Sequence, residues 1–148
     1  MPSYATIDEA QAYFDRVLNT RPWDCASSTE KTKALAQATD IIDRLNFLGT
    51  KTNDAQENQF PRNDDTVVPD DVKNATAAIA LALLDGVDPE LEYENLHLKS
   101  QGYGSVRGSY DQRPPMPHIV AGIPSVTAWR FLQPYLRDPN TFDIYRIS

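Results

Sequence analysis

The chain has 148 residues, of which 41% are hydrophobic and 24% are charged, and its formal net charge is −7. This length suits one compact domain with its own core, and the composition is that of a soluble globular protein. The bases are scattered singly along an acidic chain, which argues against nucleic-acid binding through clustered lysines and arginines.

The first predicted helix begins at Thr6 and ends near Asn19. Thr6 and Glu9 have the spacing of a capping box, in which each side chain accepts from the backbone amide of the other residue. Apolar residues then recur at helical spacing, which indicates an amphipathic helix. They are Ile7, Ala10, Phe14, Val17 and Leu18.

A second capping box, Ser27 with Glu30, begins the second predicted helix, which ends at residues 46–49. Its apolar stripe consists of Leu35, Ala38, Ile41, Ile42 and Leu45. The connection between the two helices contains Trp23, which we expect to pack on both of them as a cap to the core.

Residues 60–62, Phe-Pro-Arg, place a large apolar side chain in a segment that otherwise has the composition of an exposed loop. Two explanations are open. In the first, Phe60 folds back between the second and third helices, and Pro61 fixes the turn. In the second, the three residues contact another subunit, and Arg62 reaches an acid on the next chain. Phe60, Pro61 and Arg62 are therefore candidate interface residues.

The third predicted helix starts at Pro69, whose missing amide hydrogen costs nothing at that position, and it ends at Gly86. Asp70 and Asp71 complement the positive end of the helix dipole. Residues 75–84 are apolar almost all round, which predicts a central helix that is covered on several sides.

Four acids follow within seven residues, at positions 88, 90, 92 and 94. They raise the question of a metal site, but the glycine and the ordered oxygen ligands of a calcium loop are missing. We interpret them as a solvated acidic surface.

Residues 99–122 are rich in glycine and proline, and the segment GYGSVRGSY predicts a short β-hairpin. A last helix is expected from Pro124, with Val126, Trp129 and Leu132 on one face, and Pro134 ends it. Phe131 and Tyr135 lie away from that face, which makes them candidate interface residues.

The C-terminal residues 138–148 are too few to make a core of their own, yet they are rich in apolar side chains. Such a terminus either tucks under its own domain or pairs with another chain, for example as an added strand. Its candidate interface residues are Phe142, Ile144, Tyr145 and Ile147.

The sequence therefore predicts a mainly α fold: a small bundle of about four helices with a short β-hairpin and an extended C-terminal arm. Residues 1–98 form the helical part, and residues 99–148 add the hairpin, the short helix and the arm to the same single domain.

No catalytic pattern was found in the sequence. Cys25, the single cysteine, has no histidine at motif spacing, because His97 and His118 lie in segments of different character. There is no HExxH, CxxC or phosphate-loop motif. We expect no enzyme activity, no cofactor and no bound metal. Neither a signal peptide nor a membrane span is expected, so the protein is predicted to be made in a cytoplasm.

The order of residues between positions 4 and 86 resembles the head-to-tail adaptor proteins of tailed bacteriophages, which often carry the label of a DnaT-like single-stranded DNA-binding protein. A weaker likeness extends to SVRGSY and FLQPYL. The resemblance is carried by Tyr4, Thr6, Glu9, Ala10, Tyr13, Phe14, Trp23, Lys33, Ala34, Leu35, Ala38, Thr39, Ile42, Asp43, Phe47, Gly49, Lys51, Gln59, Phe60, Pro61, Arg62, Val68, Pro69, Val72, Ala75 and Ala78.

This resemblance implies an all-helical domain that assembles with copies of itself in a ring, commonly of twelve, beneath the portal protein of a virion. The ring extends the DNA channel, tail or stopper proteins attach to its far side, and the genomic DNA passes through without specific binding. In such adaptors a long C-terminal arm often reaches the portal or an adjacent subunit.

Two other interpretations stay open. One is a single-stranded DNA-binding module, which needs an electropositive groove with aromatic platforms. Tyr103, Arg107, Tyr110 and Arg113 could supply a modest one. The other is a cytoplasmic scaffolding protein unrelated to phage.

Overall fold

The computed structural model describes residues 2–101 and 116–137, with side chains as far as residue 95 and again from residue 116. This part of the chain contains seven α-helices and one 3-10 helix, and no strand. Two isolated antiparallel bridges occur in it, between Phe47 and Leu136 and between Lys51 and Arg62. The elements are α1 (Ile7–Phe14), α2 (Arg21–Asp24), α3 (Ser28–Asp43), α4 (Asp70–Leu84), α5 (Pro89–Gln101), α6 (Pro117–Val120), α7 (Val126–Leu132) and η1 (Gln133–Tyr135).

The predicted helical class is confirmed, but the predicted number of helices, about four, was too low. The sequence patterns did not indicate α2, α5 or α6. The predicted β-hairpin falls within residues 102–115 and the arm within residues 138–148, so both lie outside the described residues. None of the helices in the described ranges is long and apolar enough to cross a membrane.

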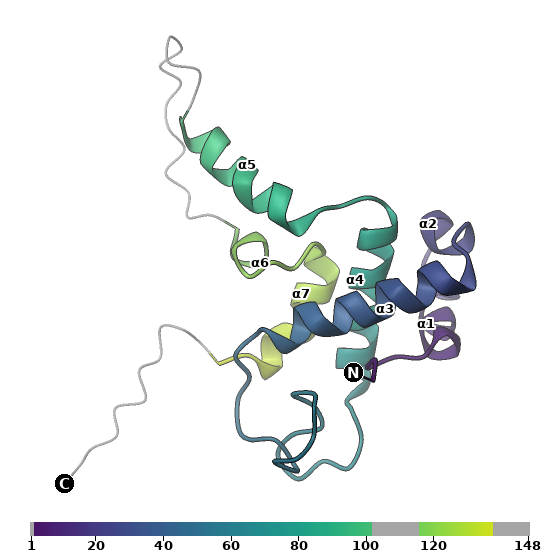
Figure 1. Cartoon of the computed structure of the whole chain (residues 1–148), viewed down its shortest axis with the longest axis vertical. Helices are drawn as coiled ribbons and strands as arrows, with labels where there is room; N and C mark the ends of the chain where they lie inside the picture. The colour runs from purple at the N-terminus through teal and green to yellow at the C-terminus, as the bar shows by residue number, and fades with distance from the viewer. Residues whose placement is uncertain (1, 102–115, 138–148) are drawn as a thin grey trace, which may run out of the picture.

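Helix α4 is the centre of the bundle, as its composition predicted. It lies between α3 and α7 and also contacts α1 and α2 (Figure 1). Every residue from 75 to 80 is buried, and four of these six are alanines, which let the neighbouring helices approach closely. The helix begins after Pro69 and is followed by Gly86, whose positive φ of 88° suits glycine.

Both predicted capping boxes are present. Thr6 accepts from the amide of Glu9 at 3.2 Å, and Ser27 accepts from that of Glu30 at the same distance. In α3, the buried Thr39 is a further link: its hydroxyl donates to the carbonyl of Leu35 and accepts from the amide of Tyr4 at 3.1 Å. The N-terminal segment is thereby attached to the middle of α3.

Helix α1 ends at Phe14, five residues before the predicted end. Two backbone hydrogen bonds between residues three apart end the helix. The amide of Arg16 donates to the carbonyl of Tyr13, and the amide of Val17 donates to the carbonyl of Phe14. Leu18, which the apolar stripe placed toward the core, is 98% exposed. The chain turns here because Trp23, on α2, is fully buried with its ring 4.8 Å from that of Phe14.

Trp23 packs between α1 and α3, as predicted. Its indole nitrogen donates to Gln11 Oε1 at 2.9 Å, so its polar atom is satisfied inside the core. On the α3 side, the Lys31 amine lies 5.0 Å from the ring centroid. An ion pair of 2.8 Å, from Lys73 to Glu9, adds a link between α4 and α1.

Helix α7 presents a different face to the core from the predicted one. Ala128 and Leu132 are buried and Ile123 before the helix is buried with them, whereas Val126 is 46% exposed. Ser125 caps the helix by accepting from the amide of Ala128 at 3.3 Å. The prediction of a Val126, Trp129 and Leu132 face was therefore wrong for Val126, because the cap places it on the outside of the first turn.

Candidate assembly surfaces

The loop that joins α3 to α4 contains the predicted Phe-Pro-Arg segment. Phe60 is only 4% exposed. Three aromatic rings surround it with centroid distances of 4.6 Å to Phe47, 5.8 Å to Tyr135 and 5.9 Å to Tyr4, all in edge-on arrangements. Phe60 thus joins the N-terminal segment, the residues after α3 and η1. The peptide bond that links it to Pro61 is cis.

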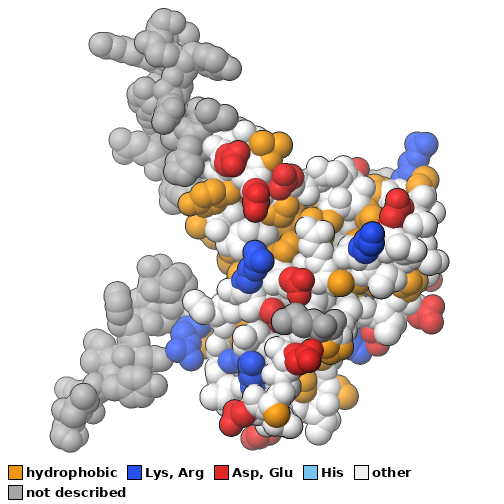
Figure 2. Space-filling model, viewed as in Figure 1, with side chains coloured by type: hydrophobic (Ala, Val, Ile, Leu, Met, Phe, Trp, Pro, Cys, Tyr) orange, Lys and Arg blue, Asp and Glu red, His pale blue; other side chains and the backbone are white. Residues whose placement is uncertain are grey.

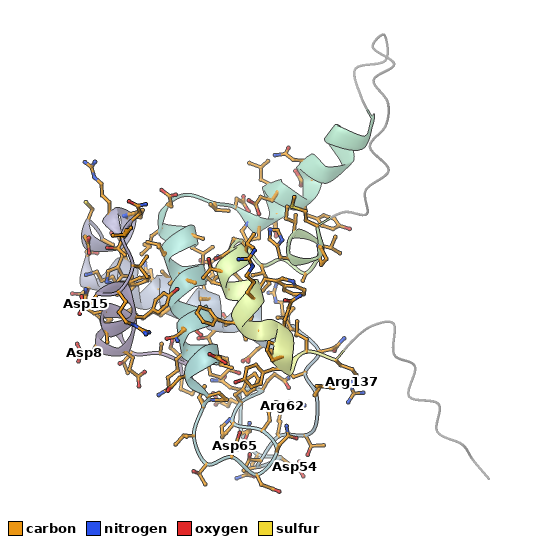
Figure 3. All side chains as sticks on the ribbon, turned by 180° about the vertical axis from the view of Figure 1, so that it is seen from behind. Asp8, Asp15, Asp54, Arg62, Asp65 and Arg137 are labelled. Atoms are coloured by element: carbon orange, nitrogen blue, oxygen red, sulfur yellow. The ribbon has the colours of Figure 1, made fainter. Side chains whose placement is uncertain are left out.

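Arg62 lies inside this loop, below α4 and α7 (Figure 3), and is 7% exposed. A guanidinium group has five N–H donors, and each of them has an acceptor in the same chain. The acceptors are the carbonyls of Phe47, Leu48, Gly49 and Gln59 and the side-chain oxygen of Gln59, at 2.6 to 3.4 Å. Arg62 therefore holds residues 47–49 against residue 59.

These contacts of Phe60 and Arg62 are those of the first explanation, in which the segment stabilises its own domain. The neighbours differ from the predicted ones, because Phe60 meets Phe47, Tyr4 and Tyr135 instead of filling the space between two helices. A subunit contact through this loop stays a prediction.

A partly buried polar pair supports the same loop. The hydroxyl of Tyr4 donates to Asp43 Oδ1 and accepts from the amide of Phe60 at 3.1 Å, and the amide of Gln59 donates to the same carboxylate oxygen at 3.3 Å. Burial raises the pKa of Asp43, although its hydrogen bond from Tyr4 acts in the opposite direction. Burial also raises the pKa of Tyr4.

The remaining interface candidates divide into two groups. Phe131 and Tyr135 are partly buried within the chain: the ring of Phe131 lies 6.1 Å from that of Tyr13, and Tyr135 packs on Phe60. Their role in assembly stays a prediction. The other candidates, Phe142, Ile144, Tyr145 and Ile147, lie outside the described residues, as do Tyr103, Arg107, Tyr110 and Arg113.

A groove lies between α5, α6 and the C-terminal half of α3, with a cavity of about 430 Å³. Apolar side chains gather over α5 and α6 in the space-filling view, next to acidic ones (Figure 2). Three of the apolar residues are about half exposed or more: Leu91 at 53%, Tyr93 at 47% and Val120 at 49%. We call this surface the α5–α6 groove. No sequence pattern indicated this surface, because the apolar residues of α5 do not recur on one face of the helix.

Three of the four acids that follow α4 line this groove. Asp88 precedes α5 and its carboxylate accepts from the amide of Glu90 at 3.0 Å, which is the role of a helix cap. Asp88, Glu90 and Glu94 line the groove together with Arg44. Within the described ranges, no group of three metal-ligand side chains is close enough to hold an ion.

A second apolar surface lies at the corner where α1 turns into α2. Leu18 protrudes there, at the edge of a cavity of about 540 Å³ whose lining includes Ala78, Leu81 and Pro124. Arg16 and Arg21 are exposed on either side of Leu18 in the sequence. We call this surface the Leu18 corner. Helices α1 and α2 lie across the bundle from α5 and α6 (Figure 1), but the cavity reaches Val87 and Pro124, next to Asp88 and Gly122 of the α5–α6 groove.

The fold and its surfaces define a class: a small acidic helical protein with apolar residues exposed on its surface. The chain belongs to the family described as "Putative DnaT-like ssDNA binding protein", whose sequence profile matches residues 1–137. No curated protein and no solved structure matches the chain.

Proposed function

We propose that the protein is a head-to-tail adaptor of a tailed bacteriophage. It forms a ring of identical copies beneath the portal protein, extends the DNA channel and provides the attachment site for tail or stopper proteins. The observation that carries the proposal is the pair of unlike apolar surfaces, the α5–α6 groove and the Leu18 corner, on one closed core. Subunits in a ring meet through two different surfaces, so each copy needs such a pair.

The charge of the chain supports the same role. DNA must slide through a neck channel, and a wall that carries many lysines and arginines would bind its phosphates. A net charge of −7 disfavours such binding. The resemblance to adaptor sequences over residues 4 to 86 is independent of the net charge, because it depends on which residues occupy positions in the helices and the loop.

The test is reconstitution with the portal protein of the phage that would encode this chain. The purified proteins are mixed and imaged by negative-stain electron microscopy, with portal alone as the control. The adaptor role predicts an added ring of density on one face of the portal. Portal particles that look the same with and without this chain would contradict it.

The description of the family favours a second function, binding of single-stranded DNA. Its predicted residues, Tyr103, Arg107, Tyr110 and Arg113, lie outside the described residues. Fluorescence anisotropy with a labelled oligonucleotide distinguishes the two functions. A DNA-binding module binds tightly at low salt and loses affinity steeply as salt is added, whereas an adaptor of this charge gives little signal at any salt concentration.

A further inference from the structure

We propose that residues 2–5 form a strap that opens and closes as Asp43 loses and gains one proton. The protonated carboxyl group keeps the strap closed, and ionisation favours an open state in which water reaches the carboxylate. The proposal goes beyond the adaptor function and does not depend on it, because the opening takes place within a single chain.

Side chains attach this strap to the rest of the protein. The side-chain amide of Asn58 donates to the carbonyl of Pro2 at 2.6 Å, and the hydroxyl of Thr39 accepts from the backbone amide of Tyr4 at 3.1 Å. The hydroxyl of Tyr4 donates to Asp43. Among the described residues, the strap makes no hydrogen bond from its own backbone to the backbone of another segment. It can therefore detach while the helices stay intact.

Apolar contacts also hold the strap against the core. Tyr4 and Ala5 are 4% and 2% exposed, and the ring of Tyr4 lies 5.9 Å from that of Phe60 in an edge-on arrangement. Burial of these side chains favours the closed strap at every pH. The open state is therefore a minor one, and the charge of Asp43 makes it more frequent.

The two carboxyl oxygens of Asp43 have different surroundings. Oδ1 accepts from the hydroxyl of Tyr4 and from the amide of Gln59, the latter at 3.3 Å. Oδ2 is buried and has no hydrogen-bond partner among the described residues. A buried charge without a partner is costly, whereas a neutral carboxyl group is far easier to bury. Because Tyr4 is the strap residue that contacts this group, detaching the strap exposes the group to water.

The charges around Asp43 determine the direction of the effect. Burial is the largest influence and raises its pKa, and the nearby Asp40 of α3 raises it further. The hydrogen bonds from Tyr4 and Gln59 and the charge of Lys51 lower the pKa, but its net direction is upward. The closed strap is therefore stabilised fully below the ordinary value of 3.8, and this contribution is lost as the pH rises through the raised pKa.

Arg62 is a further charged group beside this site. It lies beyond Gln59 and bonds to the carbonyl and the side-chain oxygen of that residue at 3.3 and 2.8 Å. Its guanidinium group stays charged at every pH at which a carboxyl group titrates. Arg62 thus keeps the loop in place while the strap opens.

Native-state hydrogen exchange, followed by NMR, tests for the strap. The Tyr4 amide reports the strap, and the amide of Ile79, which is fully buried in α4, reports global unfolding. After correction for intrinsic rates, the Tyr4 amide should exchange about tenfold faster or more, and low urea should change its exchange little, because a local opening exposes little surface. Equal exchange of the two amides, with the same response to urea, would mean that only global unfolding occurs and would overturn the strap.

The pH dependence of the opening tests the role of Asp43. The population of the open strap should rise about threefold or more between about pH 5 and about pH 8. The midpoint of this rise should coincide with the titration of the Asp43 carboxyl carbon, measured by NMR in the same sample. A population that stays constant while Asp43 titrates would contradict the proposal.

Two matched variants separate Asp43 from its surroundings. Asp43→Asn keeps an acceptor for Tyr4 and Gln59 but cannot ionise, so the opening should no longer depend on pH. Asp40→Asn removes a neighbouring exposed carboxylate, so the pH dependence should remain with its midpoint at a lower pH. A parallel response of the wild type and Asp43→Asn to pH would overturn the role of Asp43.

Tyr4→Phe gives a further test that leaves Asp43 in place. It keeps the ring that packs on Phe60 and removes the hydroxyl that contacts the carboxyl group. The amide at position 4 should then exchange about threefold faster or more at every pH. Exchange at the wild-type rate would contradict the attachment of the strap through this hydrogen bond.

Discussion

Tyr4 and Asp43 lie 39 residues apart in the sequence, and a partly buried hydrogen bond joins the hydroxyl of Tyr4 to the carboxylate of Asp43. The same hydroxyl accepts from the amide of Phe60. The second carboxylate oxygen, Asp43 Oδ2, is buried and has no hydrogen-bond partner among the described residues. This pair therefore joins the N-terminal segment, the end of α3 and the Phe-Pro-Arg loop through one short network.

Tyr4→Phe should lower the free energy of unfolding by about 1–3 kcal/mol, because it leaves the Phe60 amide without its acceptor and removes one of the two donors to Asp43 Oδ1. Urea denaturation measures the change. The matched control is Tyr13→Phe, which keeps the ring that packs on Phe14 and Phe131 and should change the stability little. Equal effects of the two substitutions would show that the Tyr4 network contributes nothing specific.

The raised pKa of Asp43 makes a prediction about pH. A carboxyl group whose folded pKa lies above its ordinary value of 3.8 contributes stability that is fully present below that value. The contribution is lost as the pH rises through the raised pKa. The wild type should therefore gain stability relative to Asp43→Asn as the pH falls from neutral toward 3.8, measured by denaturation at each pH.

Glu9 is the control of opposite sign for this pH series. Its hydrogen bond from Lys73 lowers its pKa, so its contribution is present above its ordinary value of 4.5 and is lost as the pH falls. Because its side chain is 41% exposed, the effect is small. A wild-type stability that changed with pH in parallel with that of Asp43→Asn would contradict the role given to Asp43.

Arg62→Ala should destabilise the isolated monomer by about 2–3 kcal/mol, because it leaves carbonyl groups of residues 47–49 and 59 without their donors. Arg62→Lys should recover only part of this loss, since an ammonium group has three donors and no planar fork. Thermal unfolding of the monomer measures both variants, with the exposed Arg130→Ala as the control. Unchanged melting of Arg62→Ala together with failed assembly would favour the subunit contact instead.

Gly49→Ala should be strongly destabilising, by more than the roughly 1 kcal/mol expected for a backbone effect alone. Gly49 has a φ of 77°, and a Cβ at this position would overlap the side chain of Asn63. Gly122→Ala is a close control, because Gly122 has a φ of 81° and no atom within 4 Å of the added Cβ. The difference between their melting temperatures isolates the overlap, and equal losses would contradict it.

The sequence by itself determined the features that depend on neighbouring residues. Both capping boxes, the start of α4 after Pro69 and its end before Gly86 were predicted, because a cap needs only a side chain and an amide three residues away. The apolar composition of residues 75–80 was likewise enough to identify the central helix. α5 was missed because its apolar residues do not repeat on one face.

Tertiary structure alone decided the features that bring distant residues together. Whether Arg62 pairs with an acid or with carbonyls depended on how residues 47–49 fold against residue 59. Leu18 continued the apolar stripe of the first helix, yet it is exposed because the burial of Trp23 turns the chain before that stripe is complete. A periodic pattern indicates which side chains lie on one face of a helix and can be buried together. The packing of that helix against its neighbours decides which of these side chains are buried.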